Sequence, residues 1–144
     1  MMNFQFVQKK SFGIDLGNTN TLVTDRETVL VDQPSCIVLD ESCSSVKAVG
    51  EKAYEMFEKT HTQLKPVKPL KGGVIADQNS ATKMLSVLMR LAYGDRSFLQ
   101  GYHDIIAGVP FHTTNVERRA LKNVMEQFNA RNTYLLYEPL AAAL

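Results

Sequence analysis

The first third of the chain is a series of short apolar stretches separated by polar turns. The stretches Phe12 to Leu16, Thr21 to Asp25 and Thr28 to Asp32 mix apolar residues with small or polar ones. Residues 25–27 suit a tight turn between the second and third stretch. Short stretches joined in this way predict three strands of an antiparallel meander.

From residue 74 onward, the pattern alternates between strands and helices. The predicted elements are a short strand at 74–76, a helix from Asn79 or Ser80 to Gly94, a strand at 105–109, a helix after Thr114, a strand at 133–136 and a helix at 138–144. Thr114 and Glu117 have the spacing of a capping box, and Pro139 fits the first turn of the last helix. Strands that alternate with helices run parallel, so the order predicts a ribonuclease-H-like α/β fold.

The apolar spacing also predicts which side chains are buried. The first long helix has an apolar stripe formed by Ala81, Met84, Leu85, Leu88 and Ala92. The second is expected to bury Val116, Ala120, Leu121, Val124 and Phe128. The continuous apolar run from Ile105 to Val109 suits a strand that is covered on both faces.

Residues 34–72 interrupt this order of elements. Pro34 breaks the run of strands, and the pattern then predicts strands at 36–39 and 46–49, a helix at 51–59 and an extended passage at 65–71. The extended passage, KPVKPLK, contains two prolines and cannot form a regular helix. We therefore predict a small subdomain at 34–72, inserted into a main subdomain formed by residues 1–33 and 73–144.

Composition and charge narrow the functional classes. The 144 residues are 44% hydrophobic, which is enough for one folded domain, and the formal net charge is +1. Nucleic-acid-binding proteins usually carry a strong basic excess, so nucleic acid is not expected as a partner. No stretch approaches the roughly 20 apolar residues of a membrane-spanning helix.

The cysteines and histidines do not form a recognisable metal site. Cys36 and Cys43 are the only cysteines, and no signal-peptide pattern precedes them. Their simplest role is packing in a reducing compartment, so a cytoplasmic location is expected. His61, His103 and His112 lack the spacing of metal ligands with either cysteine or with each other.

The stretch GIDLGNTNTLV, residues 13–23, changes from apolar to polar inside the meander. A glycine such as Gly17 permits close approach of a ligand and a positive φ. Successive N–H groups of a turn form an anion site, and the side chains of residues 19–21 can add donors. Asp15 suits a hydrated Mg²⁺ between the carboxylate and a phosphate. The stretch therefore suits metal-bound nucleotide phosphates, and the alternative is a polar β-hairpin with asparagine at its tip.

This stretch resembles the first phosphate-binding hairpin of the actin and heat-shock chaperone ATPase superfamily. Five further segments resemble, in order, segments of the MreB family of bacterial actin homologues, which shape rod cells: DQPSCIVLD, VGEKAYEMF, KPLKGGVIAD, GVPFHTTNVERRAL and LLYEPLAAAL. The resemblance covers nearly the whole chain from Ser11 to Leu144. It implies an actin-like ATPase domain, with the main subdomain as subdomain IA and the inserted one as IB.

The resemblance implies site roles for Asp15, Gly17, Asn18, Thr19, Asn20 and Glu138. The aspartate would hold Mg²⁺ through water, and the four hairpin residues would wrap the β- and γ-phosphates of ATP. The glutamate would position the attacking water, and its alternative role is an exposed acid at a helix start. Two positions depart from the family pattern, because Tyr137 stands where an acid is usual and Asn18 stands where threonine is usual. The rate and the nucleotide preference therefore stay open.

The resemblance also concerns the membrane. Phe98 and Leu99, in GDRSFLQGYHD, fall where the family has an apolar loop that inserts into the inner face of the cell membrane. The alternative is that both side chains pack on the following helix. Self-association into filaments and contact with the cell-wall synthesis machinery are the partners that the family implies.

Three functional hypotheses follow from the sequence. The first is the N-terminal half of an MreB-like ATPase that forms membrane-associated filaments and helps determine cell shape. The second is a naturally truncated half-actin that acts as a non-catalytic interaction module. The third is another actin-superfamily ATPase, such as a plasmid-segregating filament or a chaperone. Since the family's second phosphate hairpin would follow Leu144, the ATP and Mg²⁺ site is expected to be incomplete, and the 144 residues alone are expected to be inactive.

Overall fold

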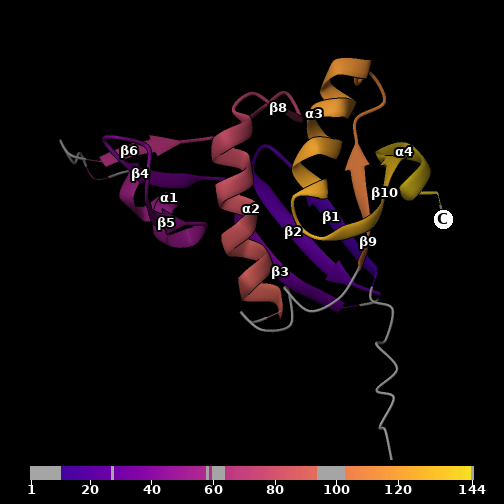
Figure 1. Ribbon diagram of the computed structural model, residues 1–144, viewed down its shortest axis with the longest axis horizontal. Coiled ribbons are helices and arrows are strands. Elements are labelled where there is room, and N and C mark those ends of the chain that lie inside the picture. Colours follow the sequence, from indigo (N-terminus) through magenta and orange to yellow (C-terminus); the bar gives the residue numbers. More distant parts are fainter. Residues whose placement is uncertain (1–10, 27, 58, 60–63, 94–102, 144) are drawn as a thin grey trace, which may run out of the picture.

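The structure is a computed structural model that describes residues 11–26, 28–57, 59, 64–93 and 103–143. Its largest element is a five-stranded sheet with the order β10-β9-β1-β2-β3 (Figure 1). The strands are β1 (Ser11–Leu16), β2 (Asn20–Asp25), β3 (Thr28–Pro34), β9 (His103–Val109) and β10 (Ala130–Tyr137). β1, β2 and β3 pair antiparallel, whereas β9 pairs with β1, and β10 with β9, in parallel. The predicted α/β arrangement, an antiparallel meander extended by parallel strands, is confirmed.

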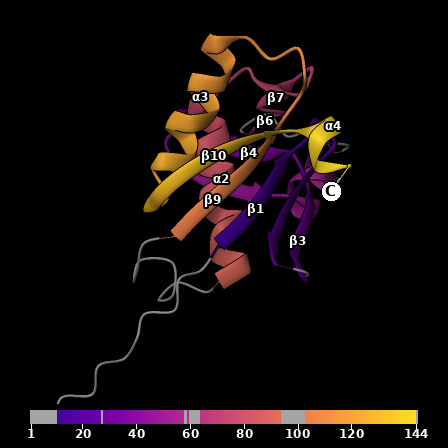
Figure 2. The ribbon, with the colours of Figure 1, turned by 90° about the vertical axis from the view of Figure 1, so that its right-hand side faces the viewer.

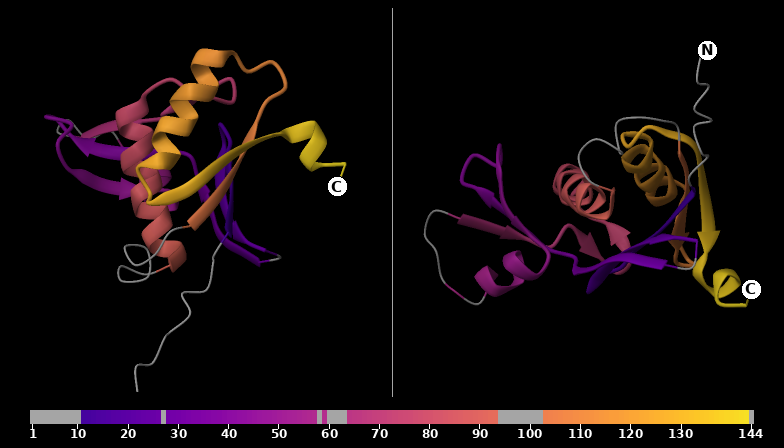
Figure 3. Two further views of the ribbon diagram at one scale, coloured as in Figure 1. Left: turned by 45° about the vertical axis from the view of Figure 1, so that its right-hand side comes forward. Right: turned by 90° about the horizontal axis from the view of Figure 1, so that it is seen from below.

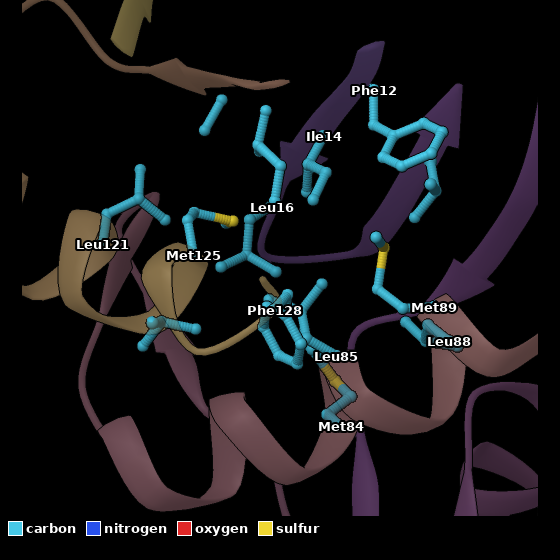
Figure 4. Packing of buried hydrophobic residues seen from close by; sticks show 14 of the residues in the cluster. Phe12, Ile14, Leu16, Met84, Leu85, Leu88, Met89, Leu121, Met125 and Phe128 are labelled. Carbon is cyan, nitrogen blue, oxygen red and sulfur yellow. The ribbon is translucent and has the colours of Figure 1, made fainter. Parts of the chain in front are cut away.

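Two long helices, α2 (Gln78–Tyr93) and α3 (Asn115–Glu126), cover one face of this sheet (Figure 2). Three alternate residues of β1 point toward them, namely Phe12, Ile14 and Leu16 (Figure 4). In the same core lie Met84, Leu85, Leu88 and Met89 of α2 and Leu121, Val124 and Met125 of α3. Burial of one such side chain contributes roughly 1.5–3 kcal/mol, so this layer is a main source of stability.

The opposite face of the large sheet is partly open. Ile106 of β9 is 40% exposed and Tyr134 of β10 is 54% exposed. The expectation that the apolar run from Ile105 to Val109 is covered on both faces is therefore wrong. Within the described residues, both long helices lie on the same face, and the second face of β9 has no comparable cover.

The burial predicted for the α3 stripe is wrong at Val116, which is 78% exposed. Ala120 is only partly buried, whereas Leu121, Val124 and Phe128 are buried as predicted. At 3.6 residues per turn, a spacing of five rotates Val116 by about 140° from Leu121, so it faces away from the core. Met125, which the prediction omitted, is fully buried instead.

The starts of both long helices are capped by local side chains. The carboxylate of Asp77 accepts hydrogen bonds from the backbone N–H of Ser80 at 3.1 Å and from its hydroxyl at 2.6 Å. α2 therefore begins at Gln78, slightly before the predicted start. Thr114 and Glu117 form the predicted capping box of α3, which is confirmed.

A second, smaller sheet lies on the other side of α2 (Figure 3). It has the antiparallel order β5-β4-β6, with β4 (Ile37–Asp40), β5 (Val46–Val49) and β6 (Leu64–Val67), and it packs with α1 (Glu51–Phe57). Ile37 and Leu39 join the large core, whereas Cys36 and Val38 pack in a second cluster with Ala53 of α1. β4 is therefore covered on both faces. The subdomain boundaries at 34 and 72 stay a prediction.

Short elements connect these layers. β7 (Leu70–Lys71) and β8 (Val74–Ile75) form a two-stranded hairpin whose turn consists of Gly72 and Gly73, with φ of +62° and +79°. The passage that was predicted to be extended thus contributes β6 and β7 to two different sheets. After β10, the helix α4 (Glu138–Ala141) begins with Pro139 in its first turn, as predicted.

Candidate functional site

The polar turn between β1 and β2 is a tight hairpin with Asn18 and Thr19 at its tip. The backbone N–H of Gly17 donates to the carbonyl oxygen of Asn20 at 3.1 Å and closes the turn. A Cβ atom at position 17 would lie 2.8 Å from that oxygen, which is closer than a real side chain tolerates. Gly17 is therefore needed for this close approach, and the positive φ that glycine also permits is not used there.

Ser35, which the sequence did not single out, holds this turn in place. Its hydroxyl donates to the carbonyl oxygen of Gly17 at 2.6 Å and lies 2.8 Å from the hydroxyl oxygen of Thr21. Its backbone N–H donates to the carbonyl oxygen of Thr19 at 2.8 Å. Ser35 and Thr21 are buried, so these hydrogen bonds are shielded from water and fix the shape of the turn.

The two asparagines of the turn are bonded to different neighbours. The Oδ1 atom of Asn18 accepts from the backbone N–H of Gly73 at 2.9 Å, and the Nδ2 atom of Asn20 donates to Asp32 Oδ1 at 2.6 Å. Within the described residues, the backbone N–H groups of Asn18 and Thr19 have no hydrogen-bond partner, and both residues are exposed. These two N–H groups are therefore the donors that the tip offers to an anion.

Asp15 and Glu138 meet beside Gly108, although they are far apart in the sequence. A Cβ atom at position 108 would lie 3.7 Å from Glu138 Cγ and 4.0 Å from Asp15 Oδ1. The same Oδ1 atom is 4.0 Å from a Cβ position at Gly17, so both carboxylates lie next to the β1–β2 turn. The parallel pairing of β1, β9 and β10 explains the meeting, because their carboxyl ends lie at one edge of the sheet.

Both carboxylates are exposed at this edge. Glu138 is the first residue of α4, and Tyr137 before it makes no side-chain cap. The hydroxyl of Tyr137 instead accepts a hydrogen bond from Arg118 Nη1 of α3 at 2.5 Å. The residue that stands where the family usually has an acid is therefore bonded to a helix of the core, and Glu138 is left as the acid that faces Asp15.

A pocket of about 240 Å³ adjoins the other side of the turn and includes Lys68, which the sequence did not single out. The pocket is lined by Asn18, Thr19, Asn20, Pro34, Ser35, Cys36, Glu51, Tyr54 and Lys68. The ammonium group of Lys68 lies 6.0 Å from the ring centre of Tyr54 and 5.7 Å from that of Phe57. Burial raises the pKa of the Cys36 thiol, and the charge of Lys68 opposes that shift. Lys68 therefore places a cation beside the turn.

The remaining predicted site residues cannot be placed. Phe98 and Leu99 lie outside the described residues. No helix in the described part of the chain is long and apolar enough to cross a membrane. The described residues also contain no group of three or more His, Cys, Asp or Glu side chains that could hold a metal ion, so Mg²⁺ would depend on Asp15 and on ligand oxygens.

Comparisons of the sequence with known proteins identify its relatives. The family model of the MreB/Mbl protein matches residues 9–144. The cell shape-determining protein MreB of Haemophilus influenzae is 35% identical over 136 residues, which are 91% of this chain and 38% of that relative. The chain thus spans about two fifths of the length of the curated relatives that it matches.

Solved structures show the same fold. The crystal structure of MreB5 of Spiroplasma citri bound to ADP matches with a TM-score of 0.82 and 30% sequence identity. The match includes 94% of this chain and 40% of the MreB5 chain. The MamK double helical filament, at 19% identity and a TM-score of 0.75 over 92% of this chain and 42% of its own, supports the actin-like fold alone. The match of sequence along residues 9–144, together with this fold, shows that the chain belongs to the MreB/Mbl family of actin-like, cell shape-determining proteins.

Proposed function

We propose that this chain forms one wall of the ATP site of an MreB-type, actin-like ATPase. The observation that carries the proposal is the meeting of the β1–β2 turn, Asp15 and Glu138 at one edge of the sheet. The binding of ADP by MreB5 of Spiroplasma citri supports a nucleotide as the ligand. ATP hydrolysis would need the complete site, because this edge supplies only one of its walls. The relatives are more than twice as long as this chain.

The residues of this edge suit a metal-bound triphosphate. The N–H groups of Asn18 and Thr19 would donate to phosphate oxygens, and Gly17 lets the turn stay small. Asp15 would hold Mg²⁺ through water, and the ion would neutralise phosphate charge when bound. Glu138 would accept a hydrogen bond from a water molecule and orient it toward the phosphate, which is how a carboxylate contributes when positioning supplies most of the catalysis.

We further propose that the assembled protein forms filaments in the cytoplasm, at the inner face of the cell membrane, and acts with the cell-wall synthesis machinery. Support comes from the relatives, which are named cell shape-determining proteins. Phe98 and Leu99 remain the proposed membrane contact. Residues 1–33 and 73–144 as subdomain IA, with 34–72 as IB, remain the proposed division.

The test is an NMR titration of the ¹⁵N-labelled chain with ATP and Mg²⁺, since one wall of a site binds weakly. The largest shifts are expected at the amides of Asn18 and Thr19. Asp15→Asn is expected to weaken binding by about tenfold in the presence of Mg²⁺, which is 1.4 kcal/mol. The effect should vanish when EDTA removes the metal.

Two controls separate phosphate recognition from general effects. Adenosine lacks the phosphates and should leave the amides of Asn18 and Thr19 unshifted. Asp25→Asn changes the same charge at the far end of β2, where Asp25 pairs with Phe12 and Thr28, and should leave binding unchanged. Equal shifts with adenosine, or an equal loss in both variants, would contradict the proposal.

A further inference from the structure

A groove of about 810 Å³ runs between α2 and the small sheet, away from the nucleotide edge. On the side of α2 it is lined by the pairs Thr82 and Lys83, Ser86 and Val87, and Arg90 and Leu91. These pairs repeat every four residues, so one face of α2 forms a continuous wall. At 1.5 Å per residue, the wall is roughly 15 Å long, which matches about three turns of another helix.

The lining of the groove is strongly cationic. It contains Lys47, Lys52, Lys83 and Arg90 but a single acid, Glu51. This is an excess of three positive charges in a chain whose formal net charge is +1. The excess is therefore a local feature of this groove and not a property of the whole surface.

The groove also contains partly exposed apolar surface. Val46 and Val49 of β5 pack against the large core but are only partly buried, and Val87 lines the opposite wall. Leu91, at one end of α2, is 66% exposed. A cationic rim around partly exposed aliphatic side chains is the complement of an amphipathic, acidic surface.

Two groups at the edges of the groove are already fixed. The ammonium group of Lys83 donates to the carbonyl oxygens of Cys43 and, at 3.4 Å, Ser44, so neutral acceptors hold it in place. The backbone N–H of Glu51 donates to the Gln33 side chain at 3.0 Å, which ties the start of α1 to β3. These hydrogen bonds hold Lys83 and the start of α1 in place, so binding needs little further ordering of these two groups.

We propose that this groove binds an acidic, amphipathic helical segment of another protein. The concave shape favours a helix over a membrane, because a flat bilayer would touch only the rim cations and not the valines between the walls. The mixture of aliphatic and cationic lining favours a peptide over nucleic acid, whose binding surfaces are more uniformly basic. The inference is independent of the ATP site, which lies at the carboxyl edge of the large sheet.

The test is fluorescence anisotropy of the full chain with a labelled helical peptide of about 18 residues, or five turns, that carries leucine on one face and glutamate elsewhere. Lys47→Glu combined with Lys52→Glu reverses two rim charges that do not contact the core. This variant is expected to bind about tenfold more weakly, and the affinity of the unmodified chain should fall as salt is raised. A peptide of the same composition in scrambled order should bind weakly to both.

The matched control is Arg119→Glu combined with Lys122→Glu, which makes the same change of charge on the exposed face of α3. It should leave the affinity within about twofold, because exposed charges beyond a Debye length are screened. Equal losses in the two variants, or equal binding of the scrambled peptide, would overturn the proposal. If the groove variant loses binding to anionic phospholipid vesicles but not to the peptide, the occupant is a membrane and the proposal is wrong. If the variant changes only the sedimentation of the chain itself, the occupant is a second copy and the proposal is also wrong.

Discussion

β4 and β9 look alike in the sequence but differ in how they are covered. Each contains a continuous apolar run, residues 37–39 in β4 and residues 105–109 in β9, and each pairs with a strand on both sides. β4 has α2 on one face and α1 on the other, and Ile37, Val38 and Leu39 are at most 1% exposed. β9 has the two long helices on one face, and Ile106 is 40% exposed on the other.

The difference shows what an apolar run can and cannot predict. The run indicates that a strand tolerates cover on both faces, but other elements of the chain decide whether each face is covered. In the small sheet, α1 follows β5 directly and folds back on β4. In the large sheet, the described chain supplies helices to one side only, so Ile106 and Tyr134 leave a partly apolar face in the open.

The largest expected effect tests this contrast with one residue type. Ile37→Ala should lower the free energy of unfolding by about 2–5 kcal/mol, because it opens a cavity in a fully buried site. Ile106→Ala should cost about 1 kcal/mol, since the side chain is 40% exposed. Urea denaturation followed by circular dichroism gives both values, and the chain has no tryptophan to follow instead. Equal losses would mean that the open face of β9 is covered in solution.

The second effect concerns the turn of the β7–β8 hairpin, which lies between β6 of the small sheet and α2 in the chain. Gly72 and Gly73 both have positive φ, but a Cβ atom at 73 would lie 2.8 Å from Pro110 Cγ, whereas one at 72 would meet nothing within 4 Å. Gly72→Ala should therefore cost about 1 kcal/mol from its backbone alone. Gly73→Ala should cost about 2 kcal/mol or more, because the steric contact is added. Thermal unfolding of the pair measures the difference, and equal melting temperatures would show that Pro110 moves aside freely.

The smallest effect concerns the Asp77 cap of α2, the helix that packs against both the large and the small sheet. Hydrogen bonds from Ser80 lower the pKa of the Asp77 carboxyl below its ordinary value of 3.8. A lowered folded-state pKa stabilises the fold above about pH 4, and that stabilisation is lost as the pH falls through the folded-state pKa. Asp77→Asn should therefore cost about 1 kcal/mol or less at pH 7, and less than that at about pH 3. Urea midpoints at the two pH values provide the measurement, and a cost that does not change with pH would argue against a charged cap.

The parts of the fold that were predicted depend on neighbours in the sequence. The β1–β2–β3 meander follows from short apolar stretches and tight turns, and the cap of α3 needs only Thr114 and Glu117. The error at Val116 was also local, since a spacing of five residues does not return to the same helix face. The parallel direction of β9 and β10 could be predicted because strands that alternate with helices run parallel.

The candidate site was predicted only in part, because its contacts are distant. The polar turn was predicted from its own residues and Glu138 from the resemblance to a family, while their meeting at Gly108 depends on strand register. Ser35 and Lys68 carry no local signal, because a serine after proline and a lysine among prolines are ordinary in extended segments. Their roles arise only when the small sheet lies against the turn.

The hydrogen bond between Asn18 and Gly73 has a mechanical consequence. Gly73 lies against Pro110, which follows β9 and so connects to Gly108, and Gly108 lies against Asp15, which leads back to the turn. These contacts form a closed ring beside the proposed phosphate site. A closed ring resists distortion better than an open loop, so the N–H groups of the tip and the carboxylate keep their spacing without a ligand. A ligand that shifts Asn18 would therefore also displace Gly73 and, through Pro110, the end of β9.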